Sequence, residues 1–438
     1  MSQNVAKTRL DNGLIVILRE MHHAPVVSFW IWYKVGSRNE KPGTTGASHW
    51  VEHMMFKGSP KFPPGSLDRL VSREGGRWNA FTTSDFTAYY ETMPADRIDL
   101  ALKLEADRME NVLMPEEDVE SERTVIISER HMYENQPSFL LQEELVAAAF
   151  RVHPYHHETI GDEADLKTMT REDLYRHYRK YYSPENAIVV VAGDFVEWEM
   201  LGRITKEFGE IPSRSLDNEV VRQEPIQRGE RRVTVHGPGE TSYLSYAYKV
   251  PQATHQDFYP LILLNAAFTG GSSLGFFGSG TTNKSSRLYK ALVATDLAAA
   301  VSGHISPTID PYLYSFSAVA RPGRSLSEIE TALEEELARL ADQPVTQAEL
   351  DKALKRAKAQ FVMAGESVTG QAQMMGLAEC VAGDYRWYEN TLDALNAVTL
   401  DDIDQVRERY LRPGNRVVGY YKPEENSKDL PSLAKAAP

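Results

Sequence analysis

Hydrophobic positions along the chain follow two periodicities, which predict helices and strands in alternation. Some long segments carry apolar residues at three- and four-residue spacings, a pattern typical of amphipathic helices. These segments are 46–58, 115–131, 327–342 and 346–365. Others are rich in aromatic and β-branched residues, which favour strands. They are 26–35, 77–93, 187–192, 241–250 and 416–421. The patterns predict an α+β protein.

The two halves of the chain repeat each other. The segments 181–186 (YYSPEN) and 410–415 (YLRPGN) are separated by a constant offset of 229 residues, and each precedes a predicted strand. The strands at 26–35 and 241–250 both end in Tyr-Lys-Val. A repeat on this scale indicates two domains of related structure.

The order of elements predicts the architecture of each half. Strands come first, helices follow, and a helix and a strand close the half, which favours helices packed on one face of a mainly antiparallel sheet. Between the halves lies a polar segment with Pro225, as is typical of a linker. We therefore expect domains at 1–212 and 231–438, joined by a linker at 213–230.

Composition limits the classes of function. With 438 residues, the chain can bury more than one core. Its net charge of −14, without a sizeable basic run, argues against nucleic acid or an anionic membrane as a partner. Cys380 is the only cysteine, so no disulfide can form within the chain. Neither a membrane-spanning run nor a signal-peptide core is present, and we expect a cytoplasmic protein.

The most specific chemical feature is the run His49-Trp50-Val51-Glu52-His53, an H-x-x-E-H pattern within a predicted helix. Residues four apart project from one face of a helix, so the two histidines can bind one metal ion. Glu52 directs its carboxylate to the edge of that ion, where it can accept a proton from water. Zinc lowers the pKa of such a water to about 7. The run predicts a zinc-dependent hydrolase, and a chance occurrence is the alternative.

A catalytic zinc site needs three protein ligands and one open position. The predicted helix at 115–131 offers two candidates, Glu122 and Glu129, which are seven residues apart and hence on one face. Either can complete a His-His-Glu site, and the other can then hydrogen-bond a ligand. The spacing leaves the choice open, and a solvated acidic face is the alternative for both.

The run at 153–158 contains three histidines and is a second place to look for a metal. Pro154 interrupts any helix there, and no further ligand-bearing element accompanies it. We expect a loop at the surface or at the active site, without a metal.

Together these residues resemble the pitrilysin-type metallopeptidases, the inverzincins of family M16. The resemblance covers most of the chain and is to the short-chain branch, which includes mitochondrial processing peptidase and its bacterial relatives. Besides the H-x-x-E-H run, the segments that carry it are 46–49, 54–59 and 79–82.

The resemblance implies that Glu129 is the third zinc ligand and that Glu122 supports the site, with one zinc ion per chain. It also implies two α/β-roll domains that face each other across a cleft, of which only the first holds the metal. Asn79 and Ala80 would lie on an exposed sheet edge beside the metal, where they could pair with the backbone of a substrate peptide.

One departure from the family pattern concerns partners. Self-sufficient members carry an Arg and a Tyr seven residues apart in the second half, which help to hold the substrate and stabilise the developing oxyanion. Here Val293 stands in place of the Arg, and Ala299 or Ala300 in place of the Tyr. Arg287 and Tyr289 are nearby but match structural positions. We hypothesise that the chain is the zinc-bearing subunit of a heterodimer whose homologous partner supplies the pair.

The sequence therefore predicts a zinc endopeptidase that hydrolyses peptides or extended, unfolded polypeptides by metal-activated water. Two alternatives are a structural or assembly subunit without turnover, and a module that binds peptides but rarely cleaves them. The intact H-x-x-E-H run argues against the first, because a purely structural subunit has no need of these groups.

Overall fold

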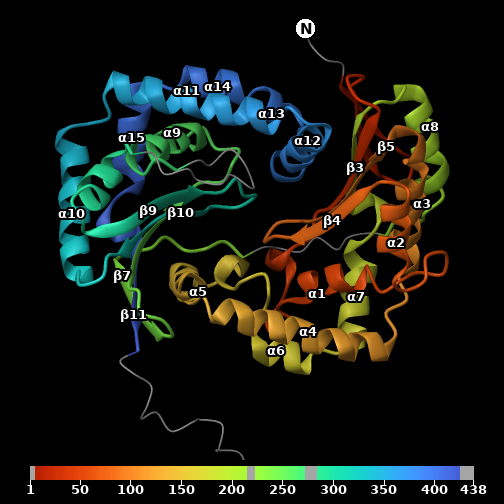
Figure 1. Ribbon diagram of the computed structural model, residues 1–438, viewed down its shortest axis with the longest axis horizontal. Coiled ribbons are helices and arrows are strands. Elements are labelled where there is room, and N and C mark those ends of the chain that lie inside the picture. The colour runs from red at the N-terminus through yellow and green to blue at the C-terminus, as the bar shows by residue number, and fades with distance from the viewer. Residues whose placement is uncertain (1–4, 215–221, 272–283, 425–438) are drawn as a thin grey trace, which may run out of the picture.

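The computed structural model describes residues 5–214, 222–271 and 284–424, which form two sheets with helices around them (Figure 1). The first sheet has six strands in the order β1-β2-β6-β3-β5-β4. They are β1 Val5–Arg9, β2 Ile15–Glu20, β3 Val26–Tyr33, β4 Arg77–Thr82, β5 Thr87–Pro94 and β6 Ala187–Gly193. Neighbouring strands run antiparallel, except for the parallel pair β2 and β6.

The second sheet has five strands in the order β7-β11-β8-β10-β9. They are β7 Arg231–Gly237, β8 Tyr243–Val250, β9 Ala298–Ile305, β10 Tyr312–Ala320 and β11 Arg416–Pro423. Here β7 and β11 are the parallel pair, and the other neighbours are antiparallel. Apart from the additional β1, order and directions repeat those of the first sheet. The predicted α+β fold with two related, mainly antiparallel sheets is confirmed.

Helices cover the strands of both halves. In the first half they are α1 Ala47–Met54, α2 Ser66–Arg73, α3 Asp99–Asn111, α4 Glu116–Glu134, α5 Pro137–Ala149, α6 Glu163–Thr168, α7 Arg171–Tyr181 and α8 Glu197–Phe208. In the second half they are α9 Phe258–Phe268, α10 Leu326–Asp342, α11 Gln347–Ala364, α12 Val368–Ala382, α13 Arg386–Glu389, α14 Thr391–Ala397 and α15 Leu400–Tyr410. The four predicted helices correspond to α1, α4, α10 and α11. Within the described ranges, no helix combines the length and apolar character needed to span a bilayer.

The repeated sequence before β6 and β11 forms the same turn in both halves. The side-chain amide of Asn186 donates a hydrogen bond to the backbone oxygen of Tyr181 at 2.9 Å, and that of Asn415 to Tyr410 at 2.9 Å. Each amide also donates to the carbonyl oxygen of the lysine in the Tyr-Lys-Val sequence of its own half. The repeat in the sequence therefore marks a repeat in the structure.

Both faces of the first sheet are buried, because its central strands carry apolar side chains on both sides. In β3, Phe29 and Ile31 belong to a core formed with α1, α3, α4, α7 and α8 of the same half. Trp30 and Trp32 alternate with them and belong to a core shared with the second half. The two halves are therefore joined by packed side chains.

Each half contributes one helix to the sheet of the other. The second-half helix α12 packs on β3 and β6, and the first-half helix α5 packs on β7 and β11 (Figure 1). Gly376 of α12 lies against the indole of Trp32, where an added Cβ atom would come within 2.1 Å of Nε1. We expected helices on one face of each sheet. The exchanged helices cover the other face, because a strand such as β6 is apolar at every position and needs cover on both faces.

The expected linker at 213–230 is described only in part, since residues 215–221 lie outside the described ranges. Residues 222–230 form neither helix nor strand. The carboxylate of Glu224 accepts hydrogen bonds from three successive backbone N–H groups at 151–153, which fastens this segment to the first half. The predicted domain limits stay a prediction.

We expect Gly376→Ala to destabilise the protein, because the added methyl group would collide with Trp32 in a packed core. The expected loss is about 1–3 kcal/mol in the free energy of unfolding, seen as a lower urea midpoint in tryptophan fluorescence. Gly202→Ala is the control. Gly202 lies in α8 with no neighbouring group within 4 Å of the added atom, so this change should be neutral or slightly stabilising. Unchanged stability of Gly376→Ala would contradict the close packing of α12 on the first sheet.

Candidate metal centre

The helix that carries the H-x-x-E-H run is short and is anchored by its apolar side. In α1, Trp50, Val51 and Met54 are buried in the first-half core. His49 and His53 lie one turn apart on another side of the helix, with ring centroids 4.6 Å apart and ring planes at 69°. The two imidazoles are therefore neighbours, as a shared metal ion requires.

Glu129 brings a third donor atom to the two imidazoles. It lies on α4, and its Oε2 is 3.8 Å from Nε2 of His49 and 3.7 Å from Nε2 of His53. Zinc ligands at about 2.0–2.2 Å in a tetrahedral arrangement lie about 3.4 Å from one another, so small movements suffice to close this set around one ion. Among the described residues, these three form the group of side chains that could hold a metal ion, with donor atoms all within 4.8 Å of one another. Two imidazoles and a carboxylate fit zinc.

Burial keeps His49 in the form that binds a metal. Removal from water, followed by the nearby charge of His53, lowers the pKa of His49 to about 3. The ring is thus neutral at pH 7, and neutral imidazole is the form that coordinates a metal.

Glu122 fixes the orientation of His53. Its Oε1 lies 2.8 Å from Nδ1 of His53, so Nδ1 carries the proton and Nε2 faces Glu129. Lys57 forms an ion pair with the other oxygen of Glu122. Burial acts to raise the pKa of Glu122, but the hydrogen bonds with His53 and Lys57 outweigh it and hold the pKa below its usual value. The carboxylate therefore stays charged.

Glu52 has the acidity expected of a group that accepts protons at neutral pH. Its burial raises its pKa to about 7, against the opposing effect of a hydrogen bond from Thr82. That bond runs from the Thr82 hydroxyl to Oε2 of Glu52 at 2.5 Å. A carboxyl group with such a pKa can both take up and release a proton near pH 7.

The two histidines, Glu52 and Glu129 open onto one cavity of about 430 Å³. It is lined by His49, Glu52, His53, Ala80, Phe81, Thr82, Glu129, Tyr133, Phe139, Glu158, Thr159 and Ile160. Ala80 lies on β4, the edge strand of the first sheet, which pairs with β5 along one side. Asn79 precedes it on that strand and is exposed. An edge of the sheet therefore runs along the cavity wall.

Three residues that contact the carboxylates of the site were not predicted from the sequence, namely Tyr133, Lys57 and Thr82. The hydroxyl of Tyr133 donates to Oε1 of Glu129 at 2.8 Å, so Oε2 is the oxygen that faces the histidines. Tyr133 and Lys57 each lie four positions after a candidate metal ligand, Glu129 and His53, and this spacing is the signal that points to them. Thr82 comes from β4, and only the fold brings it to Glu52.

The second half has apolar residues at the positions where the resemblance implies an Arg/Tyr pair. Val293 packs against the second-half core. Ala299 and Ala300 are exposed on β9, the edge strand of the second sheet. Arg287 is paired with Glu349 and donates to two backbone oxygens. Its guanidinium is thus held within its own half.

Two models of one family together match residues 15–163 and 168–357 of the chain. The model described as Insulinase (Peptidase family M16) matches residues 15–163, and the one described as Peptidase M16 inactive domain matches residues 168–357. The chain belongs to peptidase family M16. The resemblance drawn from the sequence is confirmed, and the H-x-x-E-H run lies within the first match.

M16 relatives align with nearly the whole chain. Zinc protease PqqE of Helicobacter pylori is 29% identical over 425 residues, which cover 94% of this chain and 92% of the relative. An uncharacterized zinc protease of Mycobacterium leprae is 28% identical and covers 96% and 93%. The crystal structure of a protease from Helicobacter pylori has a TM-score of 0.88 at 28% identity, covering 96% of this chain and 100% of that one. A peptidase M16 inactive domain from Pseudomonas fluorescens shares the fold, with a TM-score of 0.84 at 17% identity over 98% of this chain and 100% of its own.

We expect Glu122→Gln to weaken zinc binding about 10- to 100-fold, because it removes the charge that orients His53. Competition with a chromophoric chelator measures the affinity. Glu117→Gln, at an exposed position of the same helix, is the control and should bind zinc like the wild-type protein. Equal affinities for the two variants would contradict the role given to Glu122.

Proposed function

We propose that this M16 protein is a zinc-dependent endopeptidase that hydrolyses peptides or extended polypeptides. The observation that carries the proposal is the convergence of His49, His53 and Glu129 in one cavity with the buried carboxyl group of Glu52. The relatives named zinc proteases support it. One zinc ion per chain is proposed, bound by the first three residues.

Each residue of the centre has its own proposed role in peptide hydrolysis. When bound, zinc polarises the substrate carbonyl and lowers the pKa of a water molecule. Glu52 would accept the proton of the attacking water and pass it to the leaving amine, a transfer that suits its pKa of about 7. Thr82 occupies one oxygen of Glu52, which leaves the other for the proton. Glu122 keeps His53 in the tautomer that binds through Nε2.

The edge of β4 is proposed as the binding surface for the substrate. An extended peptide can add to an exposed sheet edge through backbone hydrogen bonds, and Asn79 and Ala80 lie on this edge. The backbone N–H of Ala80 donates to Oδ1 of Asn79 at 2.9 Å, a bond that a substrate carbonyl oxygen would replace. Backbone pairing tolerates many side chains and requires an extended segment. This favours unfolded or flexible substrates cleaved at internal bonds.

Cleavage of unstructured peptides by the purified protein tests the function. The wild-type protein should cut internal bonds, lose activity to a chelator and regain it with zinc. Glu52→Gln should bind zinc but lower kcat by about 10²- to 10⁴-fold, because the proton acceptor is gone. Full activity of Glu52→Gln would contradict the mechanism. Zinc and peptide binding without cleavage would favour a binding or structural subunit instead.

We also propose a homologous second chain that completes the active site. Val293, Ala299 and Ala300 supply neither a cation nor a hydroxyl group for the oxyanion, so an Arg/Tyr pair from a partner would add stabilisation that this chain lacks. Adding a partner with that pair should raise kcat/KM about 100-fold over the chain alone. Titration of one chain with the other, at fixed zinc, measures this. A chain as active alone as in the mixture would refute the heterodimer.

The cytoplasm is the proposed compartment. A single cysteine, Cys380, fits a reducing environment. The net charge of −14 agrees with a peptide substrate and a protein partner rather than nucleic acid or an anionic membrane.

A further inference from the structure

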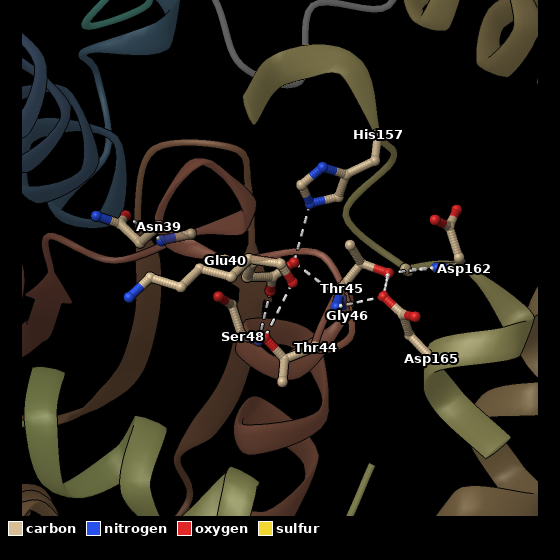
Figure 2. Close-up of polar contacts among 12 residues, drawn as sticks. Asn39, Glu40, Thr44, Thr45, Gly46, Ser48, His157, Asp162 and Asp165 are labelled. Atoms are coloured by element: carbon tan, nitrogen blue, oxygen red, sulfur yellow. Dashed lines mark hydrogen bonds and ion pairs between the residues drawn. The ribbon is translucent and has the colours of Figure 1, made fainter. Parts of the chain in front are cut away.

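The N-terminus of α1 has no cap of its own. The helix begins after Gly46, which has a φ of 88° and no side chain to accept a hydrogen bond from the first N–H groups. Glu40 supplies that acceptor from the preceding loop. Its Oε2 accepts from the backbone N–H of Gly46 at 2.8 Å, and its Oε1 from that of Ser48 at 2.7 Å (Figure 2). A buried carboxylate therefore fixes the start of the helix that carries the two imidazoles.

The same carboxylate is held by a second segment of the chain. Nε2 of His157 donates to Oε2 of Glu40 at 3.0 Å (Figure 2). His157 is 9% exposed and Glu40 is 6% exposed. Burial acts to lower the pKa of His157, but the hydrogen bond and charge of Glu40 outweigh it and raise the pKa above its usual value. The pair forms a charge-assisted hydrogen bond shielded from water.

The loop that holds Glu40 is fastened to α6. Oδ2 of Asp165 accepts from the backbone N–H groups of Gly43 and Thr45, each at 3.0 Å, and from the Thr45 hydroxyl at 2.7 Å. That hydroxyl in turn accepts from the backbone N–H of Asp162 at 2.9 Å (Figure 2). These hydrogen bonds to Asp162 and Asp165 therefore hold in place the loop that carries Glu40.

The segment 157–161 also joins α1 to α4. It lies so close to Gly46 that an added Cβ atom there would be 2.6 Å from one of its carbonyl oxygens. At its far end, the carbonyl oxygen of Gly161 accepts from Arg130 at 2.6 Å. Arg130 follows Glu129 in α4. One segment thus contacts both helices that carry metal-binding residues.

We propose that Glu40 and His157 are positioning residues of the metal centre, which hold α1 at a fixed distance from α4 and thereby set the affinity for zinc. The inference rests on the proposed function only in taking zinc as the metal. Neither residue lines the cavity, so both act through the backbone of α1. Metal donors must converge within a few tenths of an ångström, and movement of α1 displaces two of the three at once.

Zinc affinity of the full chain, measured by competition with a chromophoric chelator, tests the proposal. Glu40→Gln removes the charge and leaves one oxygen to accept, and His157→Ala removes the donor. Each should weaken zinc binding about tenfold or more and lower kcat of the zinc-loaded protein, with KM nearly unchanged. His157→Gln keeps a donor for Glu40 and should recover most of the affinity. Arg130→Gln should weaken zinc binding too, because it releases the segment from α4.

His156→Ala is the matched control. His156 lies in the same loop, but its Nδ1 is 3.0 Å from the backbone oxygen of His153 and it has no bond to Glu40, so zinc affinity should not change. Melting temperatures of the metal-free proteins separate stability from positioning. Lower melting temperatures with zinc affinity and kcat equal to wild type would overturn the proposal. Zinc binding without cleavage in the wild-type protein would refute the peptidase, while the comparison of zinc affinities would still decide the positioning role.

Discussion

Two imidazoles on one short helix meet a carboxylate from a different helix, and the candidate metal centre depends on this approach. The helix α1 has eight residues, too few to be stable without tertiary contacts. Its place is set by its apolar side in the core, by Glu40 at its start and by Glu122 at His53. The geometry of the candidate metal centre therefore depends on how α1 is anchored as well as on which residues are the ligands.

The electrostatics of the centre come mainly from burial. Removal from water favours the neutral form of both His49 and Glu52, with opposite effects on their pKa values. Glu122 escapes this tendency because His53 and Lys57 both bind its carboxylate. Two carboxyl groups close to His53 thus differ in acidity, as the roles proposed for Glu52 and Glu122 require.

The sequence indicated the fold class, the repeat and the residues that converge, because these depend on local spacing and on patterns shared with the family. Spacing alone did not decide whether Glu122 or Glu129 is the third ligand, and the fold brings Glu129 to both imidazoles and Glu122 to one. The exchange of α5 and α12 between the halves could not be predicted from the sequence. The apolar face of a strand shows that it will be buried, but not which helix will pack on it. The pairing of Glu40 with His157 could not be predicted either, because 117 positions separate the two residues and only the fold brings them together.

The Asn186 turn recurs as the Asn415 turn with the same hydrogen bonds, although within the described residues only the first half brings together side chains that could hold a metal. The shared turn thus belongs to the common scaffold, and the candidate site is a feature of the first half alone among the described residues. The two halves of the chain can therefore be compared with each other. Superposing one half on the other separates residues of the common scaffold from residues of the candidate site, without reference to a second protein.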